Sequence, residues 1–115
     1  MAQQATARAR YGAESSTSKL AKFFPEATPV RIPVRLSHSA GITDQHEETV
    51  IEFGTSTEVL FAASMALEFA DKVRVRNSDG SLDVEACVVA LQYSQGRTAV
   101  AARFTQQVSN WIVKP

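Results

Sequence analysis

The chain has 115 residues, of which 44% are hydrophobic and 21% are charged, a balance typical of one soluble globular domain. Lysine and arginine number 12 and acidic residues also number 12, and a formal charge of zero argues against a general binder of DNA or RNA. The single cysteine, Cys87, excludes an intrachain disulfide and a multi-cysteine zinc site, and the apolar runs are too short for a membrane span. We therefore expect a small cytoplasmic domain.

Residues 1–26 predict a flexible N-terminal arm, followed by a folded domain at residues 27–115. The arm is rich in Ala, Gln, Ser and Thr, and it has too few large apolar side chains to offset the entropy lost on ordering. A short helical turn around residues 18–24 is compatible with the serine and threonine caps that precede it. Basic residues such as Arg8 and Arg10 indicate a solubilising tail, and the alternative is an arm that closes over an anionic ligand.

From residue 30 onward, apolar and polar residues alternate with the period of two that is typical of β-strands. The expected strands are residues 30–36, 49–53, 58–62, 72–76, 82–93 and 98–104. Pro33 has no N–H to donate, which predicts that the first strand is irregular or at an edge there. Cys87 falls in an apolar strand, and this position indicates an inert buried thiol.

The segments between these strands predict loops and turns. Residues 38–48 are polar and predict a loop, whereas Leu67 and Phe69 are expected to anchor the 64–71 connection in the core. In the turn that begins at Asn77, Gly80 is free to adopt a positive φ.

Six short strands joined by tight turns favour a closed or nearly closed antiparallel barrel, because closure removes edges that promote aggregation. A β-sandwich is the alternative architecture. The tail around Val108, Trp111 and Ile112 has the spacing of one amphipathic helical turn that packs on the barrel.

Four stretches of the chain match the hydrophobic positions and turns of a known family. They are IPVRL at residues 32–36, STEVLFAASMALEFADKVRV at 56–75, VEACVVALQYSQGRTAVAARF at 84–104 and SNWIV at 109–113. Through them the chain resembles the PilZ domain, a small bacterial barrel that binds cyclic di-GMP. The resemblance implies an all-β, six-stranded antiparallel barrel in which L-E-x-G-x-x-V follows the binding loop, with cyclic di-GMP as the candidate ligand.

The first binding motif of the PilZ family is R-x-x-x-R, which Arg31 and Arg35 match literally. Two guanidinium groups supply paired hydrogen bonds and flat stacking surfaces for phosphate and guanine. In this chain both arginines lie within the expected first strand rather than in an arm before it. Their alternative role is that of ordinary solvent-facing strand residues.

The second motif is D/N-x-S-x-x-G, which aligns with residues 53–58. Thr55 replaces the serine, and Ser56 lies beside it as a further hydroxyl. Phe53 replaces the acid or amide, and Glu58 replaces the glycine with a bulky carboxylate that would repel a phosphate. The ligand motif is therefore expected to be eroded.

Two functions follow from the resemblance, and neither is enzymatic. The first is a cyclic di-GMP sensor that grips the ligand with Arg31, Arg35, Thr55 and Ser56. The second is a ligand-independent adaptor that uses the same barrel to contact a protein partner in bacterial signalling or motility.

A third and weaker hypothesis rests on the polar 38–48 segment, which holds metal-ligand and hydrolase residue types. The metal-ligand types are His38, Asp44, His46, Glu47 and Glu48, and the hydrolase types are His38 and Asp44 together with Ser37, which immediately precedes the segment. Because no rigid ligand spacing or nucleophile motif is present, we expect a solvated loop, with no metal and no catalytic residue.

Overall fold

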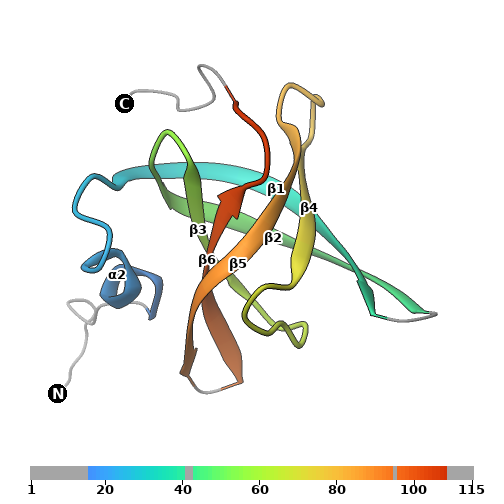
Figure 1. Ribbon diagram of the computed structural model, residues 1–115, viewed down its shortest axis with the longest axis horizontal. Coiled ribbons are helices and arrows are strands. Elements are labelled where there is room, and N and C mark those ends of the chain that lie inside the picture. The colour runs from blue at the N-terminus through green and yellow to red at the C-terminus, as the bar shows by residue number, and fades with distance from the viewer. Residues whose placement is uncertain (1–15, 41–42, 95, 109–115) are drawn as a thin grey trace, which may run out of the picture.

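The computed structural model describes residues 16–40, 43–94 and 96–108, which form one short helix and six strands (Figure 1). The elements are α2 (Ser16–Ala21), β1 (Thr28–Ala40), β2 (Thr43–Gly54), β3 (Glu58–Ala63), β4 (Lys72–Asn77), β5 (Asp83–Ser94) and β6 (Arg97–Phe104). Residues 1–15 and 109–115 lie outside the described part of the chain, and so does the helical turn predicted around Trp111.

The strands close into a barrel in the order β1-β2-β3-β6-β5-β4, and every neighbouring pair is antiparallel. The prediction of a six-stranded antiparallel barrel is confirmed, and the sandwich alternative is wrong. The closing pair is β1 with β4, where residues 34–37 lie opposite residues 74–77. The β1–β2 register shifts between Pro29 and Ile32, so the first strand is irregular just before Pro33.

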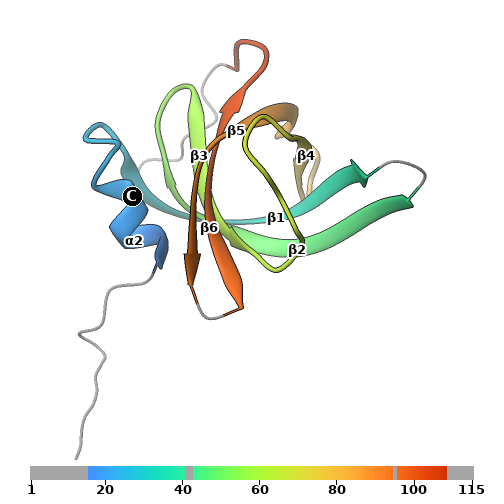
Figure 2. The ribbon, with the colours of Figure 1, turned by 60° about the horizontal axis from the view of Figure 1, so that its bottom comes forward.

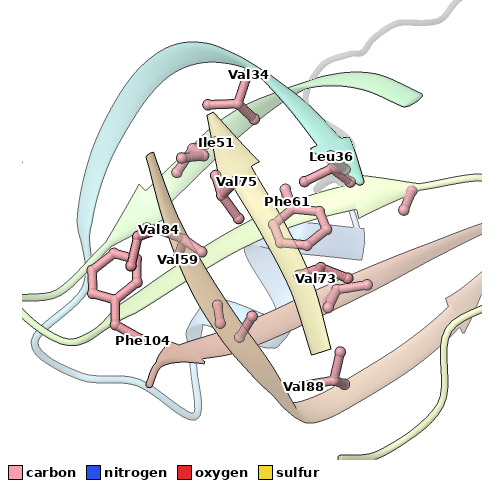
Figure 3. Packing of buried hydrophobic residues seen from close by; sticks show 14 of the residues in the cluster. Val34, Leu36, Ile51, Val59, Phe61, Val73, Val75, Val84, Val88 and Phe104 are labelled. Carbon is pink, nitrogen blue, oxygen red and sulfur yellow. The ribbon is translucent and has the colours of Figure 1, made fainter. Parts of the chain in front are cut away.

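Every strand contributes apolar side chains to the barrel interior (Figure 3). The side chains labelled there are Val34, Leu36, Ile51, Val59, Phe61, Val73, Val75, Val84, Val88 and Phe104. The alternation on β4 explains this arrangement, because Val73 and Val75 are buried while Arg74 between them is exposed. The interior is therefore filled by side chains and is not a ligand cavity.

A second apolar cluster lies outside the barrel wall, beneath α2. Leu20 of the helix is 4% exposed and packs with Leu60, Ala99 and Ala101 of β3 and β6. Residues 16–26 were expected within the flexible arm, but the structure places α2 in the folded unit. The reason is that Leu20 finds an outward-facing apolar strip, whose small alanines leave room for the helix (Figure 2).

The prediction of a loop at residues 38–48 is wrong. β1 continues to Ala40 and β2 begins at Thr43, so this segment forms the long β1–β2 hairpin that projects beyond the barrel (Figure 2). Because the projecting part has no core to cover, its strands are polar on both faces. The sequence of these two strands therefore lacks the alternation of apolar and polar residues by which strands are predicted.

The connection between β3 and β4 differs from expectation at Phe69. Leu67 is 8% exposed and belongs to the interior cluster as predicted, whereas Phe69 is 71% exposed. The backbone changes course at Ala70, which has a φ of 76°. Ala70 stands at the glycine of L-E-x-G-x-x-V, and its N–H donates to the Val88 carbonyl at 2.9 Å.

Replacing Ala70 with glycine is expected to raise the free energy of unfolding by about 0.5–1 kcal/mol. At positive φ, the steric strain of alanine is larger than the additional conformational entropy that glycine loses on folding. Urea denaturation followed by circular dichroism would measure the change. The matched control is Ala66→Gly in the same connection, where φ is not positive and glycine is expected to destabilise. A loss of stability in Ala70→Gly would contradict the prediction.

The glycine turns agree with the sequence, since Gly80 and Gly96 have φ values of 77° and 84°. Cys87 is half-buried rather than fully buried, with its Sγ 3.6 Å from the Ala70 carbonyl oxygen.

Candidate functional site

Arg31 and Arg35 both lie on the outer face of β1 and are exposed to solvent. Within the described residues, neither guanidinium has an ion-pair or hydrogen-bond partner. Four residues along a strand span roughly 13 Å, so the two guanidinium groups can contact the same phosphate only if both side chains bend toward each other. The two arginines also line separate hollows that share Glu48.

Thr55 is buried, and its hydroxyl bonds within the β2–β3 connection. Thr55 Oγ1 donates to Glu58 Oε1 at 2.8 Å and accepts from the backbone N–H groups of Thr57 at 3.1 Å and Glu58 at 2.9 Å. The Thr55 N–H also donates to the Glu58 carbonyl at 2.9 Å. Thr55 therefore closes a turn by local bonding, whereas Ser56 remains exposed beside it.

Glu58 is held by an arginine that the sequence analysis did not single out. Arg103 Nε and Nη2 donate to Glu58 Oε2 at 3.0 and 2.7 Å, and the two residues are opposite partners on β3 and β6. The Glu58 side chain is 11% exposed, and that of Arg103 is 56% exposed. The carboxylate at the family's glycine position is therefore neutralised and built into the barrel wall.

Phe53 also has a structural role in place of the family's acid or amide. It packs against the cluster beneath α2, beside Leu20 and Leu60. The β2–β3 register shifts between Ile51 and Phe53, so Ile51 packs in the interior cluster and Phe53 against the outer one.

The structure does not bring the four predicted ligand residues together. Gly54, which precedes Thr55, lies opposite Thr28, whereas Arg35 lies opposite Glu48. From Thr28 to Arg35, β1 extends roughly 23 Å at the usual rise per residue. Neither Thr55 nor Ser56 lines the hollows beside Arg31 and Arg35.

The residues considered for metal or hydrolytic chemistry are distributed over the projecting hairpin. Ser37 Oγ lies 3.1 Å from His46 Nδ1, whereas His38 Nδ1 contacts the Lys72 carbonyl oxygen at 2.9 Å. Ser39 Oγ donates to Asp44 Oδ1 at 2.8 Å. In the described part of the chain, no group of three His, Cys, Asp or Glu side chains is arranged to hold a metal ion.

Glu47 from the same segment secures the connection after β3. Its carboxylate accepts from the backbone N–H groups of Ser64, at 2.8 and 3.0 Å, and of Met65, at 2.9 Å. Arg97 Nη2 lies 3.7 Å from Glu47 Oε2 and donates to the Ala62 carbonyl at 3.1 Å.

A row of four charged residues crosses the outer face of β2, β1, β4 and β5, and no motif in the sequence marks it. Successive opposite partners in the row are Glu48, Arg35, Arg76 and Asp83. Arg74 Nε and Arg76 Nη2 donate to Asp83 at 2.7 and 3.2 Å. The hydrogen bond from Arg74, followed by that from Arg76, lowers the pKa of the Asp83 carboxyl.

No known protein-family model matches this chain, and no curated protein matches it. Among the described residues, no helix has the length and apolar character needed to cross a membrane.

Proposed function

We propose that this chain is a PilZ-type regulatory binding module that acts as a protein adaptor without binding cyclic di-GMP. The observation that carries the proposal is the closed network of Thr55, Glu58 and Arg103 at the position of the family's second motif. We place the protein in the cytoplasm, in bacterial signalling or motility, as the resemblance implies.

The network opposes ligand binding in the family mode for an energetic reason. A guanine that used the Thr55 hydroxyl would have to break its bonds to Glu58 and to the turn backbone. Each buried polar group left without a partner costs about 1–3 kcal/mol. Freeing Glu58 would also place an unpaired carboxylate beside the ligand phosphates.

The proposal includes no catalytic role. Ser37 and His46 make a contact between a nucleophile and a base, but it lies on the exposed hairpin. Within the described residues, no acid contacts His46 to orient its ring for proton transfer.

A second candidate retains cyclic di-GMP at a different position. Arg31 and Arg97 line one hollow of about 520 Å³ on the outer surface, and two guanidinium groups suit a phosphodiester. Glu48 and Glu52 line the same hollow and oppose an anion there. We therefore rank this candidate below the adaptor.

Calorimetric titration with cyclic di-GMP is expected to show no binding tighter than about 100 μM, because the ligand loop is closed by its own contacts. The same titration on Arg35→Ala and on Arg97→Ala identifies any site that does bind, because Arg31 belongs to both candidate sites. Submicromolar binding that Arg35→Ala weakens and Arg97→Ala leaves unchanged would overturn the adaptor proposal in favour of the family mode. Binding that only Arg97→Ala weakens would establish the alternative site beside Arg97.

A further inference from the structure

The row of charges across β1 and β4 contains an unusual central pair. Arg35 and Arg76 are opposite partners on adjacent strands, where like charges destabilise a sheet. Asp83 accepts one hydrogen bond from Arg76 and one from Arg74, whereas Arg35 has no partner among the described residues. We call Arg35 and Arg76 the arginine pair; with Arg74 beside them, three exposed arginines face the two carboxylates of Glu48 and Asp83, which leaves one positive charge in excess.

Two hollows meet at the arginine pair. The first, of about 550 Å³, is lined by both arginines together with Pro33, Val34, Glu48, Thr49, Val50, Asn77 and Ser78. The second, of about 330 Å³, is lined by both arginines together with Ser37, His46, Arg74 and Asp83. An apolar recess therefore lies on one side of the pair, and a polar, mainly cationic recess lies on the other.

The strand pairing explains why the apolar recess exists. In the described ranges β4 pairs with β1 only at residues 34–37, so none of the described strands lies on that side of β1 before Val34. Pro33 lies at this boundary and has no N–H to offer to an added strand. A molecule that binds here must therefore be recognised mainly through its side chains.

We propose that this surface docks an extended acidic segment of a protein partner. One carboxylate lies between Arg35 and Arg76 and accepts from both guanidinium groups, and a neighbouring apolar side chain enters the recess beside Pro33 and Val50. The inference rests on the proposed adaptor function and assigns it a surface. Glu48 and Asp83 border the pair, so the sign of charge alternates across the row once the acid is bound.

Charge complementarity favours a separate partner over residues 1–15 and 109–115 of this chain. Residues 1–15 carry Arg8 and Arg10 against the single acid Glu14, and residues 109–115 carry Lys114 and no acidic side chain. Neither sequence supplies an acidic segment for the arginine pair. A carboxylate from a partner would reduce the repulsion between the two guanidinium groups, and this gain is absent at an isolated arginine.

Nuclear magnetic resonance titration of the ¹⁵N-labelled full chain tests the inference with two synthetic peptides. One is acetyl-Asp-Val-Asp-Leu-Asp-amide, and the other has asparagine in place of each aspartate. Only the acidic peptide is expected to shift amide signals, and these should lie in residues 34–37 and 74–77. Binding should weaken as salt is raised, because the contacts are exposed charge pairs.

Arg35→Gln and Arg76→Gln are each expected to weaken binding of the acidic peptide by about fivefold or more. Arg31→Gln is the matched control, because it removes an exposed arginine of the same strand that lies outside both hollows. Thermal unfolding of each variant verifies that it is folded.

Three results would overturn the assignment of this surface: no shifts with the acidic peptide, equal shifts with the asparagine peptide, or an equal loss in Arg31→Gln. These results would leave the adaptor proposal in place but would require that the partner binds a different surface. Tight binding of cyclic di-GMP in the calorimetric experiment would instead overturn the adaptor proposal itself, so the two failures are distinguishable.

Discussion

Replacing Phe61 with alanine is expected to lower the free energy of unfolding by about 3–5 kcal/mol. Phe61 lies in the centre of the barrel interior, is 0% exposed and is the largest fully buried side chain of the described residues (Figure 3). The loss combines the transfer energy of the ring with the cavity that a closed barrel cannot collapse to fill. Urea denaturation followed by circular dichroism measures it.

A domain with a total stability of about 5–15 kcal/mol can unfold under this change, so Phe61→Leu serves as a milder second variant. The matched control is Phe69→Ala, which removes the same ring from a position that is 71% exposed. It is expected to change stability by less than about 0.5 kcal/mol. Equal losses at the two positions would contradict the described packing.

Replacing Glu58 with alanine is expected to lower the free energy of unfolding by about 2 kcal/mol. The change removes the acceptor of the Thr55 hydroxyl and of two Arg103 donors. The exposed outer part of Arg103 limits the loss, because solvent screens a charge pair that is not fully buried. The same denaturation experiment measures the change, with Glu48→Ala as the control for an exposed glutamate that makes no ion pair among the described residues.

A double-mutant cycle with Arg103→Ala separates the pair from the rest of the network, and a coupling of about 1 kcal/mol is expected. If Glu58→Ala were as stable as the native protein, the network would not hold the loop closed. The proposed adaptor function would then lose the observation that carries it.

The strands were predictable where one face meets the core and the other meets water. On β4, the alternation around Val73 and Val75 specifies both the strand and which of its residues face the core. The β1–β2 hairpin was missed beyond Ser37 because its residues there are polar on both faces, so no hydrophobic alternation marks the strands. Phe69 was expected to anchor the 64–71 connection in the core because it is a large apolar residue, but beside Ala70, whose φ is 76°, it is 71% exposed.

The candidate site was less predictable, because it depends on the register between distant strands. Arg103 lies 45 residues from Glu58 along the chain, and only the β3–β6 pairing places them opposite each other. The arginine pair likewise arises from the pairing of β1 with β4. The sequence shows Arg76 only as one polar residue in an alternating strand, with nothing to mark Arg35 as its neighbour.

The short pairing between β1 and β4 has a consequence for the motion of the barrel. Among the described residues, β1 and β4 pair only through residues 34–37 and 74–77, whereas β1 pairs with β2 from Thr28 to Ala40. Breaking the β1–β4 pairing would unroll the barrel into an open sheet while every other strand pair stayed intact. Arg35 lies on β1 and Arg76 on β4, so a carboxylate that bridges them would stabilise the pairing of these two strands. If the proposed partner binds this surface, its binding and the opening of the β1–β4 pairing would form one linked equilibrium, in which occupancy of the surface would set how often the pairing opens.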